Sequence, residues 1–167
     1  MNSSPDGQKA RSLATQISLM QAAEKLIASN GIQNVSIKEI VTEAGQKNES
    51  ALQYHFRNLQ GLIDAIHIRR NTQTHEKRAE LLEELESATE SPSLRDLCKV
   101  MVLPAFLLSI ADPKFRRYLI AFSHEVALAP ESALSKVSKT GGGGESGQRT
   151  GQLLRAALAH LDESGYR

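Results

Sequence analysis

The sequence predicts an all-α protein with a three-helix helix-turn-helix head followed by a helical ligand-binding and dimerisation body. Three observations support this prediction. Apolar residues recur at three- and four-residue steps through most of the chain, no segment alternates convincingly as a strand would, and residues 36–56 have the pattern of two short helices joined by a tight turn. Since aromatic residues make up only 4% of the chain and tryptophan is absent, leucine, alanine and isoleucine must build the core.

The chain begins with a polar segment, residues 1–12, which we expect to be a flexible tail. A helix is predicted from Leu13 to Ser29, because apolar residues form a stripe along one face. The stripe consists of Ile17, Met20, Ala23, Leu26 and Ile27. The helix should end at Gly31, because glycine readily adopts the left-handed conformation that follows many helices.

The next two helices carry clear terminal signals. Ser36 and Glu39 have the spacing of a capping box, in which each side chain bonds the other residue's backbone amide. Gly45 should close this second helix. The third helix is predicted to start with Asn48 as N-cap and to run to about residue 53 or 54. We therefore place the helix-turn-helix domain at residues 13–58.

The body, residues 59–167, is expected to be helical as well. Asn58 can cap a long helix whose stretch between His67 and Glu80 is nearly all polar and reads as a solvated connector. Ser91-Pro92-Ser93 should end that helix.

Further helices follow that boundary. Residues 94–111 predict an apolar helix that Pro104 kinks or breaks. Another helix should begin at Asp112-Pro113 and end at Ala129-Pro130, with a short helix over residues 131–137. The run from Thr140 to Gly147 reads as a flexible loop because consecutive glycines are costly in a helix. A last amphipathic helix is expected over residues 150–161, so the body looks short at its C-terminus.

A DNA-reading helix needs an outward polar face and an inner face packed on two other helices. The third helix and the residues around it offer donors and acceptors for base edges and phosphates. Because 20 basic residues face 19 acidic ones, any attraction to DNA must come from their local arrangement. The candidate DNA-binding residues are Ser36, Lys38, Lys47, Asn48, Glu49, Ser50, Gln53, Tyr54, His55 and Arg57.

These residues stand in an order that resembles a known family. Asn30-Gly31 is followed by residues 35–40 (VSIKEI), by 43–45 (EAG) and by 54–56 (YHF). Over residues 13–66 the chain resembles the N-terminal DNA-binding domain of TetR-type transcriptional regulators. The resemblance implies a cytoplasmic homodimer that binds double-stranded DNA, with a helical body that binds a small-molecule effector. It also implies that the effector weakens DNA binding, as in a ligand-responsive repressor.

Two questions about the body remain open. Apolar and aromatic side chains could line an effector cavity, although for each of them a place in an ordinary core is the favoured interpretation. These residues are Met101, Phe106, Phe115, Tyr118 and Phe122. If the dimerisation helices are incomplete, the chain could instead be an interaction module that pairs with a longer homologue and modulates it.

Other functions find little support in the sequence. His75-Glu76 and His124-Glu125 each lack a second histidine one turn later, so no metal site is expected. No nucleophile–base pair or nucleotide-binding loop indicates an enzyme, and no cofactor is expected. The single cysteine, Cys98, fits a reducing cytosol, and no apolar run approaches the length of a membrane span.

Overall fold

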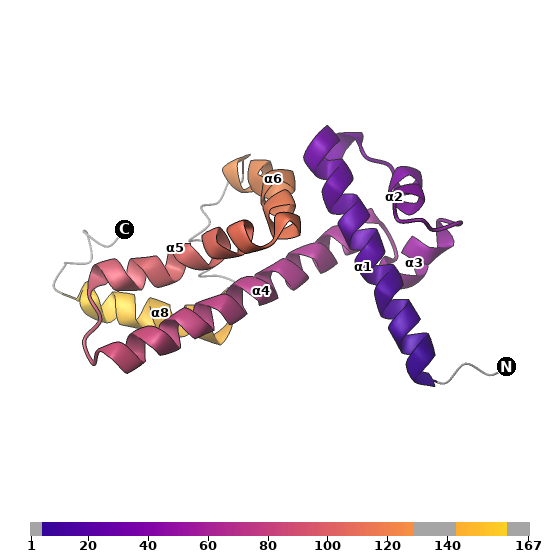
Figure 1. The fold of residues 1–167 in the computed structure, drawn as a ribbon. Coiled ribbons are helices and arrows are strands. Elements are labelled where there is room, and N and C mark those ends of the chain that lie inside the picture. The colour runs from indigo at the N-terminus through magenta and orange to yellow at the C-terminus, as the bar shows by residue number, and fades with distance from the viewer. Residues whose placement is uncertain (1–4, 129–142, 160–167) are drawn as a thin grey trace. The chain divides into compact units, whose positions relative to one another are not determined.

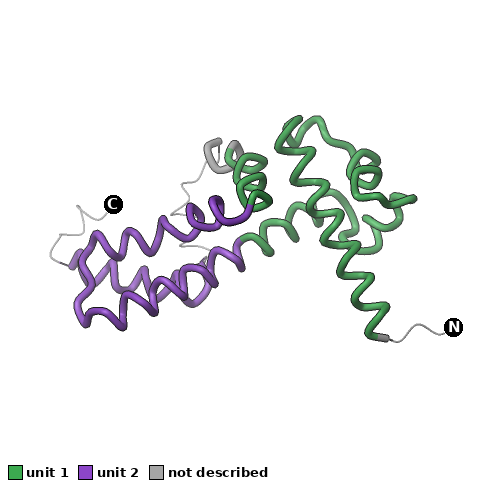
Figure 2. The backbone as a smooth tube through the Cα atoms, in the orientation of Figure 1, with its two compact units in different colours: residues 1–70, 113–127 green, residues 71–112, 128–167 purple. Residues whose placement is uncertain are grey.

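The structure, a computed structural model, describes residues 5–128 and 143–159, and within these ranges every regular element is a helix (Figure 1). The chain divides into two compact units (Figure 2). One comprises residues 1–70 and 113–127, and the other comprises residues 71–112 and 128–167. In the ranges described, no helix is both long enough and apolar enough to cross a membrane.

The first unit contains the three-helix head. Helix α1 spans Pro5–Asn30, the 3₁₀ turn η1 spans Ile32–Asn34, α2 spans Ile37–Glu43 and α3 spans Ser50–Phe56. The all-α prediction and the order of these helices are confirmed.

The prediction that residues 1–12 form a tail is wrong from Pro5 onward, because α1 begins there rather than at Leu13. Proline suits the first helical turn, where its missing N–H would have no helical partner. Asp6 adds a negative charge at the positive end of the helix dipole.

The predicted helix ends are largely confirmed. Ser36 and Glu39 form the capping box, with Ser36 N donating to Glu39 Oε2 over 2.8 Å and Glu39 N donating to Ser36 Oγ over 3.3 Å. Gly45 follows α2 with φ of 69°, the left-handed conformation that glycine tolerates. Asn58 Oδ1 accepts from Gly61 N over 2.9 Å at the start of α4, which spans Leu59–Ala88.

The core of this unit is built from α1, α2, α3, the first turns of α4, and α6, which spans Pro113–Leu128. Most of its side chains are aliphatic and buried, and Phe122 of α6 joins them. Burying each such side chain contributes roughly 1.5–3 kcal/mol relative to leaving it exposed. The fully buried members are Leu19, Ala23, Ile40, Leu52, Leu62 and Ile66.

The second unit packs the later turns of α4 with α5, which spans Leu94–Ala111, and α8, which spans Gly144–Ala157. Helix α5 runs through Pro104 without ending, so of the kink or break predicted there, the break is excluded. Pro104 is buried within this helix, although it cannot donate a backbone hydrogen bond there.

Helix α8 begins earlier than predicted, at Gly144 rather than at Thr150. Contacts with α4 offset the low helix propensity of glycine: Ser146 Oγ donates to the carbonyl oxygen of His75 over 3.0 Å. Helix α8 ends at Ala157, with Leu158 as its C-cap residue, so the predicted extent to residue 161 is wrong. The expected stop at residues 129–130, the short helix over 131–137 and the loop residues 140–142 lie outside the described residues.

The polar stretch of α4 is not simply a solvated connector. Arg70 and Arg78 are both buried, the first in the head unit and the second in the body unit. Arg70 forms a two-point ion pair with the buried Glu24 of α1, with Nε to Oε1 at 2.7 Å and Nη2 to Oε2 at 2.8 Å. The solvated prediction is therefore wrong at these two positions.

Candidate nucleic-acid interface

Helix α3 divides sharply into an inner and an outer face. Leu52 and Phe56 point into the core of the head, whereas Ser50, Gln53 and Tyr54 are exposed. Tyr54 is 83% exposed, which is high for a large aromatic ring in a folded domain. The outer face can therefore donate and accept hydrogen bonds to a surface that approaches it.

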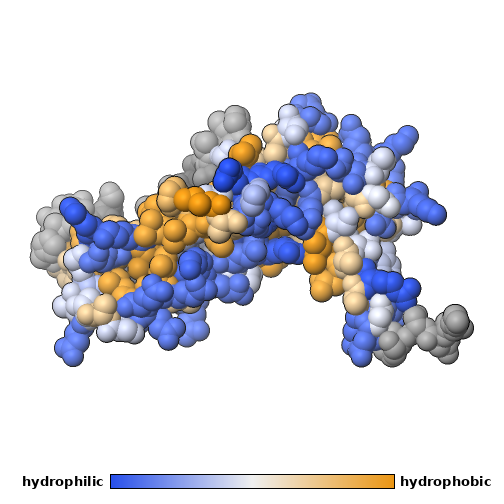
Figure 3. Space-filling model, viewed as in Figure 1, coloured by the Kyte–Doolittle hydropathy of each residue, from blue (hydrophilic) through white to orange (hydrophobic). Residues whose placement is uncertain are grey.

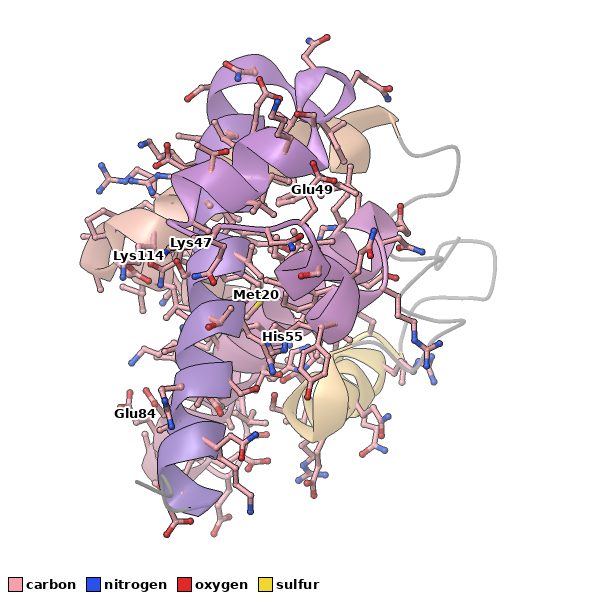
Figure 4. All side chains as sticks on the ribbon, turned by 90° about the vertical axis from the view of Figure 1, so that its right-hand side faces the viewer. Met20, Lys47, Glu49, His55, Glu84 and Lys114 are labelled. Carbon is pink, nitrogen blue, oxygen red and sulfur yellow. The ribbon has the colours of Figure 1, made fainter. Side chains whose placement is uncertain are left out.

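The connection between α2 and α3 adds a second group of exposed polar side chains. Lys47, Asn48 and Glu49 all lie there, and Figure 4 labels Lys47 and Glu49 on the side of the head that faces the viewer. Asn48 is the predicted cap: its Oδ1 accepts from Ser50 N over 2.9 Å, although the helix itself begins one residue later than a cap at Asn48 would give. Its side-chain NH₂ remains available as a donor.

At the start of α2, the two candidate contacts differ in what they can offer. The Ser36 hydroxyl both accepts from Glu39 N and donates to Glu39 Oε2 over 2.6 Å, so it is already engaged. These hydrogen bonds from Ser36 lower the pKa of the Glu39 carboxyl, which keeps it ionised at neutral pH. Lys38 is exposed and carries a charge suited to a phosphate.

A groove of about 820 Å³ separates the first turns of α1 from the end of α3. Its walls include Lys9 and Arg11 on α1 and Tyr54 and His55 on α3. Gln16 Nε2 lies 3.4 Å from His55 Nδ1, within hydrogen-bond distance, so His55 forms the wall of the groove rather than the outer face of α3.

Lys9 and Arg11 are functional candidates that the sequence reasoning missed, since it placed them in a tail. Pro5 followed by Asp6 was the signal that a helix starts before them. As part of α1 they stand across the groove from Tyr54. The groove thus adds two cations to the face that α3 presents.

Close backbone packing fixes the angle of α3 against α4. A Cβ added at Gly61 would lie 2.1 Å from the carbonyl oxygen of Phe56, so only glycine allows this approach. Arg57, at the end of α3, has φ of 68°, a left-handed conformation that a residue with a side chain adopts at a cost. The turn therefore holds the exposed Arg57 side chain beside the outer face of α3.

Comparison with known proteins agrees with this geometry. Residues 19–66 match the family model described as bacterial regulatory proteins, tetR family. The chain carries a TetR-type DNA-binding domain. The match covers α2, α3 and the packed parts of α1 and α4, and it confirms the predicted helix-turn-helix. No match was found among curated proteins.

The predicted effector-lining residues are divided between the two compact units. Phe115, Tyr118 and Phe122 of α6 belong to the same unit as the TetR-type domain. There they pack with His67, whose Nδ1 lies 3.2 Å from the Tyr118 hydroxyl, and with Arg70, whose guanidinium carbon lies 5.6 Å from the centre of the Phe115 ring.

The other two members of that set lie on α5 in the second unit. Met101 is half-buried and Phe106 is 56% exposed. A groove of about 530 Å³ lies between α4 and α8 in this unit, and it is lined mainly by polar residues, among them Glu83, Glu86 and Arg149. Within the ranges described, no cluster of three or more histidine, cysteine or acidic residues could hold a metal ion.

Proposed function

We propose that this chain is a sequence-specific transcriptional regulator, a repressor whose TetR-type domain leaves DNA when the body binds a small effector. The observation that carries the proposal is the outer face of α3. It is polar and exposed, and its inner face is packed on α1 and α4 so that its direction is fixed. That is the arrangement a helix needs to enter a major groove.

The side chains around α3 divide into two roles. Ser50 and Gln53 project from the helix and suit base edges, since an amide can make two hydrogen bonds to adenine. Tyr54, Lys47 and Arg57 stand at the ends of the helix, where phosphates would run. Lys9 and Arg11 extend this positive edge across the groove along α1.

A dimer is part of the proposal, because two heads would read two half-sites about one DNA turn apart. Helix α5 supports association: Val102, Phe106 and Ile110 lie at four-residue steps and are each more than half exposed. Figure 3 shows apolar side chains gathered over this helix. An exposed apolar stripe usually marks a surface that another protein covers.

The proposal is tested by fluorescence anisotropy with duplexes taken from the DNA beside the chain's own gene. Tyr54→Ala and Lys47→Ala should each weaken binding, and Lys47→Ala should lower the salt dependence by about one unit of slope. Lys99→Ala is the matched control, because Lys99 is an exposed lysine of the body, paired with Asp96. Binding that is unchanged in both head variants would contradict the proposed interface.

Sedimentation distinguishes the proposed homodimer from its alternative. A stable homodimer at micromolar concentration supports the regulator. A monomer that binds DNA only weakly, and that associates with a longer homologue, would support the interaction module instead, with the α5 stripe as its contact surface.

A further inference from the structure

Among the described residues, Arg78 is a buried cation with no carboxylate within ion-pair distance. It lies on α4 in the body unit and is only 8% exposed. In the described part of the chain its guanidinium makes one hydrogen bond, in which Nη1 donates to the carbonyl oxygen of Gly143 over a long 3.3 Å. Its Nε is buried and has no partner, and no described carboxylate lies within ion-pair distance of it.

Arg70 on the same helix shows what a satisfied buried arginine looks like in this chain. Both of its bonds to Glu24 are shorter than 3 Å and reach both carboxylate oxygens. Arg78 has no such acid among residues 5–128 and 143–159, and burial lowers its pKa. Since arginine cannot lose its proton in a protein, the charge stays, and no ion pair within these ranges offsets its desolvation.

The surroundings of Arg78 suit an anion. Gly143 is the N-cap residue of the 14-residue helix α8, and no side chain caps that end. The first amides of a helix attract negative groups because they have no helical acceptor and lie at the positive end of its dipole. Arg78 reaches this end through its bond to the Gly143 carbonyl oxygen.

Two glycines bring the helix end close to α4. A Cβ on Gly143 would lie 3.4 Å from Arg78 Nη1, and a Cβ on Gly144 would lie 2.9 Å from His75 Nδ1. The backbone can therefore approach the arginine without a side chain between them. An oxygen atom bound here would meet the guanidinium and the helix amides together.

We infer that Arg78 and the first turn of α8 bind an oxyanion, the carboxylate or phosphoryl group of a small ligand. The guanidinium fork matches such groups with two hydrogen bonds, and Nε is one of the donors it would use. The ligand would accept from the guanidinium donors that the Gly143 carbonyl oxygen leaves free, Nε among them, because that oxygen also accepts from Gly147 N within α8. That this ligand is the effector rests on the proposed regulatory function.

The groove between α4 and α8 is a different place. Arg78 is not among its lining residues, and Glu83, Glu86 and Glu145 line it. Glu83 and Glu86 of α4 make this groove unfavourable for an anion. Glu145, in the first turn of α8, also lines the groove, so the oxyanion would bind on the side of that turn where Arg78 lies.

The test uses the full chain without DNA. Inorganic phosphate and, separately, acetate are titrated by calorimetry at constant ionic strength, against the wild type, Arg78→Met and Arg149→Met. Arg149 is the matched control, because it is an exposed arginine of α8 paired with Glu86. We expect saturable binding of at least one anion, unchanged in Arg149→Met and weakened about tenfold or more in Arg78→Met.

A second variant covers the case in which Arg78→Met fails to fold. Arg78→Lys keeps a charge but loses the fork, and it should also bind the anion more weakly than the wild type. Absence of saturable binding by either anion, or equal binding by the Arg78 and Arg149 variants, would overturn the inference. Because no DNA is present, failure of the DNA-binding proposal would leave this result unaffected.

Discussion

The buried pair between Glu24 and Arg70 gives the sharpest test of how the head unit is held together. Both side chains are 4% exposed, and the guanidinium bonds both carboxylate oxygens. Arg70 also lies over two rings of α6, at 5.6 Å from the centre of Phe115 and 5.9 Å from that of Tyr118. One cation therefore joins α1, α4 and α6.

Replacing only one partner should be costly. In Glu24→Leu the arginine keeps its charge and its desolvation but loses its counter-ion, and such a break typically costs about 3–5 kcal/mol. The two rings remain as partners of the cation, and a desolvated cation–π contact is worth about 2 kcal/mol or more, so we expect the lower end of this range. For a chain of this size, a net loss of roughly 3 kcal/mol lowers the melting temperature by on the order of 10 °C.

Thermal unfolding followed by far-ultraviolet circular dichroism measures this effect. The double variant Glu24→Leu/Arg70→Met removes both charges and should recover most of the lost stability, since apolar replacements of buried pairs are often neutral or better. Lys25→Gln is the control, because it breaks the exposed pair with Glu43 and should cost at most about 1 kcal/mol. A single variant as stable as the wild type, or a double variant no better than the single one, would refute the reasoning.

Three further predictions concern single residues of α4 and of the turn that precedes it. Gly61→Ala should destabilise the head by about 1–3 kcal/mol in denaturant unfolding, because the new Cβ meets the Phe56 carbonyl oxygen; an unchanged midpoint would contradict this packing. Arg57→Gly should raise stability by about 1 kcal/mol by relieving the positive φ, yet weaken DNA binding in anisotropy; equal DNA affinity would remove Arg57 from the interface. In the folded protein, burial and the charge of Arg78 lower the pKa of His75 from its usual value of 6.5. The neutral imidazole therefore contributes a stability that is complete above pH 6.5 and is lost as the pH falls through the lower pKa of the folded state. The melting temperature of His75→Gln should consequently fall less on acidification than that of the wild type. If the melting temperatures of the two proteins fall equally with pH, His75 does not contribute this pH-dependent stability.

The helix-turn-helix could be predicted because its signals are local. These signals are the capping box at Ser36, the positive φ of Gly45, and the hydrogen bonds that the Asn48 and Asn58 side chains accept at the starts of α3 and α4. Each depends on residues within one turn. The apolar stripe of α1 could be predicted for the same reason, because its apolar residues recur at three- and four-residue steps in the sequence. The exposed residues of α3 could be predicted because they lie on the helix face opposite the buried Leu52.

The features that escaped prediction depend on contacts between distant segments. Nothing near Arg70 in the sequence shows that Glu24, on another helix, meets it, and a polar stretch usually means solvent. The same holds for Arg78 and the glycines that begin α8, whose contact with α4 outweighs their poor helix propensity. The early start of α1 is different, because Pro5 and Asp6 signalled it locally.

The central claim is that the outer face of α3, together with the first turns of α1, meets DNA. It is tested most directly by amide chemical-shift mapping of the isotope-labelled 18.3 kDa chain with and without a bound duplex. The largest changes should fall on Ser50, Gln53 and Tyr54 and on residues 9–11. Changes confined to α5 and α8, with α3 unaffected, would contradict it.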